Sequence, residues 1–120
     1  MQVTFKTKSG RLSIVDEAAN QKEGFEKVGA LQEVFEDEPC GKCGGEDIKF
    51  QVRHVQDGKK SFIYYEKICR NLSCRARLSF GSHQEGDTLF PKRFEKDGDK
   101  TVVIGKNGWV KYNKETGKDE

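Results

Sequence analysis

The stretch CRNLSCRARLSFG, residues 69–81, carries two of the four cysteines in the chain and three arginines. The other two cysteines lie in CGKCGG, residues 40–45, so the pattern is C-x2-C, 25 residues, then C-x4-C. Zinc prefers four soft ligands in a tetrahedron, and a tight turn that carries two thiolates supplies half of that set. We therefore expect one structural zinc ion, bound by Cys40, Cys43, Cys69 and Cys74.

The composition indicates a small domain that needs such a staple. The chain has 120 residues, of which 33% are hydrophobic and 35% are charged. Small domains with few apolar residues bury a thin core, and a bound metal commonly supplements it. The N-terminus MQVTFKTKSG has no apolar signal-peptide core, and no run of about 18 apolar residues predicts a membrane span. We expect a cytoplasmic protein whose cysteines stay reduced and bind metal.

Residues 1–39 predict a β-hairpin followed by one helix. VTFKT and RLSIVDE alternate apolar and polar residues around a Ser9-Gly10 turn, which is typical of two short strands. Asn20 and Glu23 form a weak capping box at the start of the helix. The apolar residues of the helix recur at three- and four-residue spacing, namely Phe25, Val28, Leu31 and Phe35. We expect this stripe to pack on the hairpin.

The segment between the two cysteine pairs predicts an antiparallel hairpin. IKFQVRHV and SFIYYEKIC alternate in polarity, and the Asp57-Gly58 dipeptide between them favours a tight turn. RARLSF, residues 75–80, predicts a third strand whose inner side carries Ala76, Leu78 and Phe80. This layout resembles the zinc ribbon over residues 40–80, although the second cysteine pair has four intervening residues where two is commonest.

The remaining residues add strands but no further motif. TVVIG and GWVKY predict two strands joined at Lys106-Asn107-Gly108, and KETGKDE predicts a frayed tail. The expected fold class is α+β, with an N-terminal hairpin and one helix packed on a zinc-ribbon antiparallel sheet. The expected segments are 1–39, 40–83 and 84–120, together forming one compact domain.

A complete shell of four thiolates argues against catalysis at the metal. Catalytic zinc keeps an open position for water, and neither H-E-x-x-H nor the H-x-E deaminase context occurs. His54 and His83 are alternative ligands in chemical terms, but four cysteines already fill a tetrahedron. We therefore expect a non-enzymatic protein.

The positive charge is concentrated around the cysteines. Residues 1–39 hold five basic and eight acidic residues (net −3), residues 40–80 hold nine and four (net +5), and residues 81–120 hold eight of each. Four thiolates around Zn²⁺ leave a charge of −2, which explains Arg70 and Lys42. Arg75 and Arg77 are expected on the outer side of their strand, where they favour an anionic partner.

Aromatic residues interleave with these cations, which is typical of proteins that bind single-stranded nucleic acid. Tyr65 is the best exposed candidate because it shares a strand face with Lys67. The aromatic residues expected in or beside the core are Phe50, Phe62 and Tyr64. The expected nucleic-acid contacts are Arg53, Tyr65, Lys67, Arg75, Arg77, Lys92, Arg93, Trp109 and Lys111.

The segments YYEKIC, CRARLSFG, LFPKR and GWVKY together resemble small zinc-ribbon proteins of phages. The resemblance implies a role in DNA replication or recombination in the host cytoplasm, with single-stranded DNA as the partner. RNA is left open by the residues alone. The alternative is a protein-interaction adaptor, or an accessory subunit of a replication or transcription complex. In that case the helix or the acidic segment 33–38 contacts the other protein.

Overall fold

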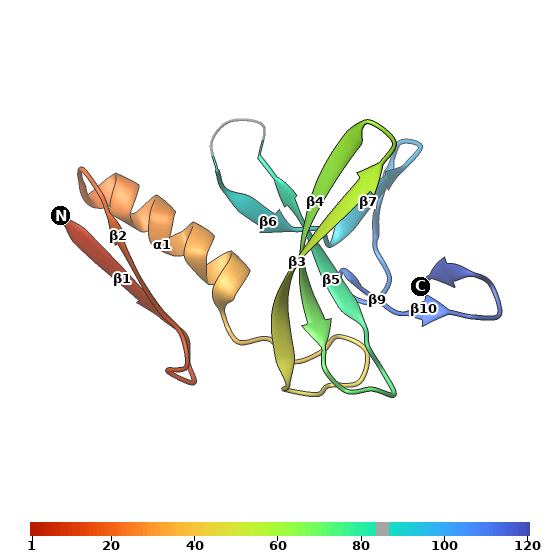
Figure 1. Ribbon diagram of the computed structural model, residues 1–120. Helices are drawn as coiled ribbons and strands as arrows, with labels where there is room; N and C mark the ends of the chain where they lie inside the picture. Colours follow the sequence, from red (N-terminus) through yellow and green to blue (C-terminus); the bar gives the residue numbers. More distant parts are fainter. Residues whose placement is uncertain (84–86) are drawn as a thin grey trace. The chain divides into compact units, whose positions relative to one another are not determined.

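Figure 1 shows the computed structural model, which describes residues 1–83 and 87–120. One helix and several antiparallel sheets give an α+β fold with an N-terminal hairpin, as predicted. The chain divides into two compact units, Met1–Asp37 with Ser82–Phe90, and Glu38–Gly81 with Pro91–Glu120. Most of the expected third segment therefore lies in the ribbon unit. The expected boundary after residue 83 adjoins residues 84–86, which lie outside the described residues.

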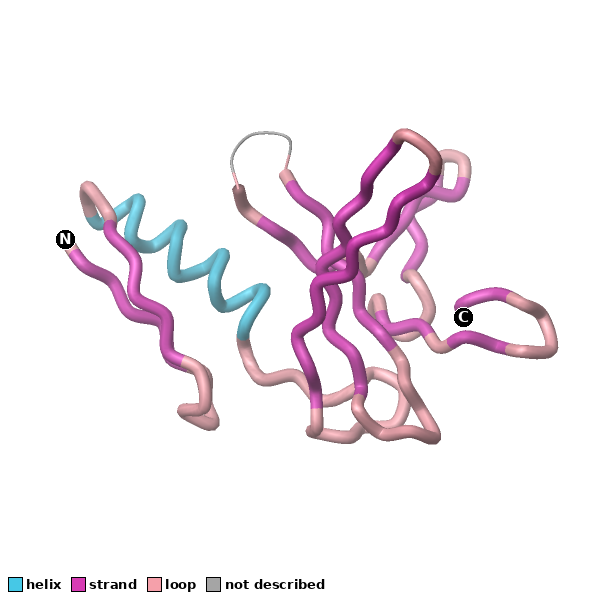
Figure 2. Tube along the Cα trace, viewed as in Figure 1, coloured by secondary structure: helices cyan, strands magenta, loops and turns pink. Residues whose placement is uncertain are grey.

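The first unit contains a hairpin and the helix. Strands β1 (Gln2–Lys6) and β2 (Ser13–Glu17) pair antiparallel, and α1 (Gln21–Phe35) follows (Figure 2). Phe5 pairs with Ile14, so Val3, Phe5 and Ile14 share one face, as the alternation predicts, whereas Val15 pairs with Thr4 on the other face. Phe5 is buried there.

The start of α1 is capped as the sequence predicts. The Asn20 side chain accepts a hydrogen bond of 2.9 Å from the backbone N–H of Glu23. The Glu23 carboxylate reaches back to the backbone N–H of Ala19 at 3.3 Å, one residue before the cap. Both interactions satisfy N–H groups that the helix itself leaves without acceptors.

The packed face of α1 differs from the predicted stripe. Gly24 and Val34 are the buried residues of the helix, whereas Phe25 is 84% exposed. A Cβ atom added at Gly24 would lie 3.1 Å from Cγ1 of Val3, so the missing side chain lets the helix approach β1 closely. That contact turns the neighbouring Phe25 toward solvent. The expectation that Phe25 packs on the hairpin is wrong for this reason.

Two acidic side chains after the helix hold the β1–β2 turn. Glu36 accepts a hydrogen bond of 3.0 Å from the backbone N–H of Lys8, and Asp37 accepts one of 2.7 Å from that of Ser9. Half of the acidic residues in segment 33–38 are therefore engaged with the backbone of their own unit.

The second unit is built on a long twisted ribbon. Strands β3 (Ile48–Asp57) and β4 (Lys60–Cys69) pair over all ten residues, and Figure 2 shows them as the longest strands. The two-residue turn between them has Gly58 at φ 62°, which places glycine at the first central position of a type II′ turn. The Asp57-Gly58 prediction is confirmed.

Further short strands complete the sheet. Its order is β3-β4-β5-β6, with β9 also paired to β5. Separate hairpins are formed by β7 with β8 and by β10 with β11. The bounds are β5 Arg77–Ser82, β6 Leu89–Pro91, β7 Phe94–Asp97, β8 Lys100–Val103, β9 Trp109–Val110, β10 Tyr112–Asn113 and β11 Lys118–Asp119.

The core of the second unit is small. Its fully buried large side chains are those of Trp109, Leu78 and Cys69, with Ala76 and Phe80 also buried. The inward direction of Ala76, Leu78 and Phe80 is confirmed. Within the described residues, no helix is long and apolar enough to cross a membrane.

The two glycines of α1 provide a matched test of its packing. We expect Gly24→Val to lower the free energy of unfolding by about 1–3 kcal/mol, because the added atoms overpack the contact with Val3. Gly29 has no atom within 4 Å of an added Cβ, so Gly29→Ala should raise the same quantity by ~0.5–1 kcal/mol. Urea unfolding followed by circular dichroism measures both changes, and equal effects of the two substitutions would contradict the packing.

Candidate metal centre

The four cysteines meet at the base of the ribbon. Cys40 and Cys43 precede β3, Cys69 ends β4, and Cys74 precedes β5. Their four Sγ atoms all lie within 4.8 Å of one another. The Cys40–Cys74 and Cys43–Cys69 sulfur pairs are separated by 3.7 Å and 3.6 Å. Disulfide sulfurs lie at about 2.05 Å, so these are four free thiols brought to one point.

The sulfur positions fit a metal ion. Metal–sulfur bonds of about 2.3 Å in a tetrahedron give sulfur–sulfur edges of about 3.8 Å. The two sulfur pairs at 3.6 and 3.7 Å match that edge. Three of the four cysteines are buried, and Cys43 is exposed. The cluster is therefore compatible with binding one metal ion and is consistent with a zinc site. Among the described residues, neither His54 nor His83 belongs to it.

The two cysteine turns use the same hydrogen bonds. The backbone N–H groups of Lys42 and Gly45 donate to the sulfurs of Cys40 and Cys43, each at 3.4 Å. In the second turn, the backbone N–H groups of Asn71 and Ala76 donate to Cys69 and Cys74. In every case the donor lies two residues after the cysteine. Donors aimed at sulfur favour the thiolate form that a metal requires.

Arg75 belongs to the second turn rather than to the strand. Its φ is positive, at 54°. Gly44, at the same place in the first turn, also has a positive φ, of 76°. Both residues follow the second cysteine of their pair, and the chain must take a left-handed conformation there. Strand β5 begins only at Arg77. The expectation that Arg75 and Arg77 share one face of a strand is wrong, because Arg75 lies in the left-handed cysteine turn before the strand begins.

Without an ion, the thiols differ widely in acidity. The backbone N–H of Gly45, followed by the Cys69 thiol, lowers the pKa of Cys43 to about 7. Burial raises the pKa of Cys69 to about 12 and also raises the pKa of Cys74. Four thiolates are therefore not stable together at neutral pH, and an entering cation must displace protons.

The indole of Trp109 lies against the first cysteine turn. A Cβ atom added at Gly41 would meet Cδ1 of the indole at 2.4 Å and Cγ at 2.5 Å. Trp109 itself is fully buried, and its strand β9 pairs with β5. Gly41 is therefore required for close approach, and the turn is fixed from the C-terminal part of the chain.

Glu38, two residues before Cys40, links the start of the first cysteine turn to Arg93 and Trp109. Its carboxylate accepts two hydrogen bonds from Arg93, at 2.8 and 3.0 Å, and one of 2.9 Å from Nε1 of Trp109. Nζ of Lys67 lies 4.0 Å away. Burial raises the pKa of Glu38, but the donors from Arg93 and Trp109 outweigh it, and the pKa lies below its ordinary value. The carboxylate thus stays charged as the centre of a partly buried network.

This network removes three expected nucleic-acid contacts. Trp109 is 0% exposed and Lys67 is 2% exposed, so neither side chain reaches a ligand on the surface. Lys67 lies between two phenylalanine rings, 5.5 Å from the Phe50 centroid and 5.9 Å from that of Phe80. Arg93 holds Glu38 with both Nη atoms. The interpretation of these three as binding residues is corrected to a structural role.

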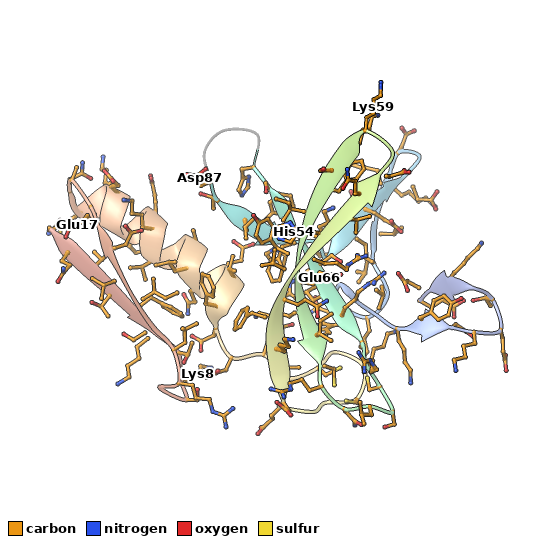
Figure 3. The ribbon with its side chains drawn as sticks, viewed as in Figure 1. Lys8, Glu17, His54, Lys59, Glu66 and Asp87 are labelled. Atoms are coloured by element: carbon orange, nitrogen blue, oxygen red, sulfur yellow. The ribbon has the colours of Figure 1, made fainter. Side chains whose placement is uncertain are left out.

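Glu66, labelled in Figure 3, lies on the opposite face of β4 from Lys67. It binds Arg53 and Arg77, two more residues that were expected to contact nucleic acid. Its buried carboxylate lies 3.0 Å from Nε of Arg53 and 3.7 Å from Nε of Arg77. Arg77 also donates to Asp119. Arg77 is therefore held by two carboxylates. Arg53 donates to Glu66 through Nε, and its guanidinium lies 4.7 Å from the ring centroid of Tyr64.

The other predicted contacts stay exposed but are dispersed. Tyr65 lies on β4, Lys92 in the connection before β7, and Lys111 beside the second cysteine turn, where its Nζ donates to the Ser73 carbonyl. Arg70 faces Asp47 at 3.9 Å. Arg53 and Tyr65 both lie on the ribbon, but on opposite faces, because Arg53 pairs with Tyr64 and Tyr65 pairs with Val52.

The sequence did not reveal Glu38 as a functional residue of the fold. Glu38 and Trp109 are 71 positions apart, and no local pattern links them. The one sequence feature that indicates close packing here is Gly41, directly after Cys40, because glycine lets another group approach the backbone.

Comparison with known proteins gives no relative. No protein-family model matches the sequence, no curated protein matches it, and no solved structure matches the fold. The resemblance to phage proteins is not supported by any of these comparisons. The function is therefore inferred from the site itself.

Cobalt substitution tests the metal site. We expect the protein to bind one Co²⁺ per chain and to show the visible bands of a tetrahedral thiolate complex, because four sulfurs already surround one point. Cys43→Ser should lose most of that absorption, while Ser73→Ala, beside the site, should keep it. A spectrum typical of octahedral Co²⁺, or no binding, would contradict the four-thiolate site.

Two glycines of the first turn separate packing from turn geometry. We expect Gly41→Ala to lower the free energy of unfolding by about 1–3 kcal/mol, because its Cβ would overlap the Trp109 ring. Gly44→Asn should have a smaller effect, since an added Cβ there meets nothing within 4 Å and asparagine tolerates positive φ. Chemical denaturation with zinc present compares the two variants. Similar losses would argue against a close Trp109 contact.

Proposed function

We propose that the protein is a zinc-stapled module that binds single-stranded nucleic acid, DNA in the first instance, through the β3–β4 ribbon. The observation that carries the proposal is the set of exposed aromatic side chains on this ribbon. Phe62 is 41% exposed, Tyr64 39% and Tyr65 37%. A role in DNA replication or recombination is the corresponding cellular context.

Zinc serves here as a structural ion. Four thiolates fill a tetrahedron and leave no position for water, so the site supports neither hydrolysis nor proton transfer at the metal. Its location, where β4 ends and β3 and β5 begin, lets it hold both strands of the ribbon at their base. The protein is accordingly proposed to bind rather than to catalyse.

The face of the ribbon that carries Phe62, Tyr64 and Arg53 has the chemistry for stacking on bases, and Tyr65 lies on the opposite face. The rings of Phe62 and Tyr64 stack on each other with centroids 6.4 Å apart, and Arg53 covers Tyr64. These residues were expected in or beside the core, but the ribbon extends past the rest of the sheet. In β4, only residues 65–68 pair with β5. Aromatic rings stack on any base, so binding of this kind has little sequence preference.

Cations at the ribbon tip supply contacts to phosphate. Lys59 and Lys60 are exposed at the turn, where Figure 3 shows Lys59 pointing outward, and neither has a carboxylate partner among the described residues. Lys49 is exposed at the other end of β3. These lysines replace Lys67, Arg77 and Arg93 as the proposed backbone contacts.

The adaptor alternative receives less support. It relied on the acidic segment 33–38, yet Glu36 and Asp37 bind backbone N–H groups in their own unit. Glu38 is the acceptor for Arg93 and Trp109. Glu33, the remaining acidic residue of the segment, is exposed.

Fluorescence anisotropy with labelled oligonucleotides tests the proposal. We expect Phe62→Ala with Tyr64→Ala to weaken binding of single-stranded DNA about tenfold or more, since stacking contributes about 1–3 kcal/mol per base. Lys59→Ala with Lys60→Ala should reduce the slope of log K against log salt by about 1.4, because each phosphate contact contributes about 0.7 on single strands.

The control removes the same charge elsewhere. Lys22→Ala with Lys100→Ala, both exposed and outside strands β3 and β4, should leave the affinity and the salt slope nearly unchanged. Equal weakening by the two lysine pairs would indicate a diffuse electrostatic effect. Absence of binding to single-stranded DNA and RNA at low salt would refute the proposed function, and tighter binding to duplex would refute the stacking mode.

A further inference from the structure

A buried carboxylate holds the Arg53 guanidinium from one side. Nε of Arg53 donates to Oε1 of Glu66 at 3.0 Å, and the Glu66 side chain is 1% exposed. The other carboxylate oxygen of Glu66 lies 3.7 Å from Nε of Arg77, so the carboxylate lies between two arginines. Hydrogen bonds between charged groups are roughly twice as strong as neutral ones. The orientation of the Arg53 guanidinium is therefore set before a ligand binds.

The other edge of this guanidinium is accessible to a ligand. Its Nη1 and Nη2 groups form a planar fork that presents two parallel N–H donors. The side chain is 42% exposed, so the fork can be reached from solvent. The guanidinium lies over the ring of Tyr64, which in turn stacks with Phe62. The fork is therefore at the level of the aromatic rings on which bases are proposed to stack.

We propose that Arg53 recognises a guanine in the bound single strand. This contact rests on the proposed function, because it requires the strand to lie along the ribbon. Guanine presents two adjacent acceptors, O6 and N7, and a bidentate arginine is the commonest specific contact to them. The Nη fork supplies the two matching donors, while Glu66 occupies Nε and directs the fork. One base-specific contact is thereby added to stacking that accepts any base.

The other bases match the fork less well. Adenine has its N6 amino donor beside N7 and N1, and thymine has an N–H group beside each carbonyl oxygen, so both place a donor against a donor. Cytosine has two adjacent acceptors, N3 and O2, but its single ring offers less area for stacking than a purine. The expected order of affinity is therefore guanine, then cytosine, then adenine and thymine.

A phosphate group is the other ligand that suits a bidentate arginine. The position of Arg53 favours a base, because Arg53 pairs with Tyr64 within the ribbon and its guanidinium lies over that aromatic ring. The proposed phosphate contacts are the exposed lysines near the two ends of the ribbon, Lys49, Lys59 and Lys60. Only recognition of a base makes the affinity depend on which base is present, so experiment separates the two ligands.

Fluorescence anisotropy with single-base replacements in one strand tests the contact. The probe is an oligothymidine of about 12 nucleotides, with its central base replaced by guanine, cytosine, adenine or 7-deazaguanine. We expect the guanine strand to bind about fivefold or more tightly than the thymine strand, because a bidentate pair discriminates to this degree. The 7-deazaguanine strand keeps the fused ring but lacks the N7 acceptor. It should lose most of the preference, and it tests the contact on the unaltered protein.

Arg53→Lys keeps the positive charge but removes the planar fork. We expect this variant to bind the guanine and thymine strands with affinities within about twofold of each other, because a lysine cannot present the paired donors. Arg11→Lys, at an exposed arginine of the first unit, should retain the wild-type preference. Circular dichroism of Arg53→Lys verifies that the variant is folded.

Failure of this contact and failure of the proposed function give different results. Equal affinity of the wild-type protein for all the strands would overturn the guanine contact and leave the stacking mode in place, as would an unchanged preference in Arg53→Lys. Binding to the cytosine or 7-deazaguanine strand as tight as to the guanine strand would also overturn it. Absence of binding to every strand would overturn the proposed function as well.

Discussion

The second unit depends on the contact between Trp109 and the first cysteine turn. The indole fills the space that a side chain at Gly41 would need, and its N–H is bound by Glu38, two residues before Cys40. Trp109 also pairs through β9 with β5, the strand that follows Cys74. One side chain therefore connects the two turns that carry the thiols. The metal can hold those turns only if the protein presents four sulfurs at one point, and this contact orients them.

The excess of positive charge around the cysteines has mostly a structural purpose. Lys67 is buried between aromatic rings beside Glu38, and Arg77 is paired with Glu66 and Asp119. Buried Glu66 and Lys67 are consecutive residues on opposite faces of β4, so each face of the strand buries one charge and needs partners from its neighbours. The segmental charge of the sequence is therefore a poor guide to its surface. The exposed cations of the ribbon itself are Lys49, Lys59 and Lys60, near its two ends.

Features that depend on local spacing could be predicted from the sequence. The cysteine pattern gave the cluster, Asp57-Gly58 gave the turn, and Asn20 gave the helix cap. Features that depend on tertiary contact could not. Phe25 fits the helical period, but Gly24 packs against β1 instead, and Arg75 lies in a left-handed turn where strand alternation was expected. The partners Glu38 and Trp109 are 71 positions apart, and no local pattern in the sequence links the carboxylate to the indole.

The structural zinc ion proposed for the four-cysteine cluster would let the ribbon leave its aromatic residues exposed. Structural zinc in small domains contributes about 10–16 kcal/mol to folding, which is comparable to the total stability of a typical domain. A protein with such a contribution does not need to bury Phe62, Tyr64 and Tyr65, all of which remain exposed. Exposed aromatic area lowers solubility unless a ligand covers it. Its retention on a two-stranded ribbon, beside lysines without carboxylate partners in the described residues, supports the proposed use of this surface in nucleic-acid binding.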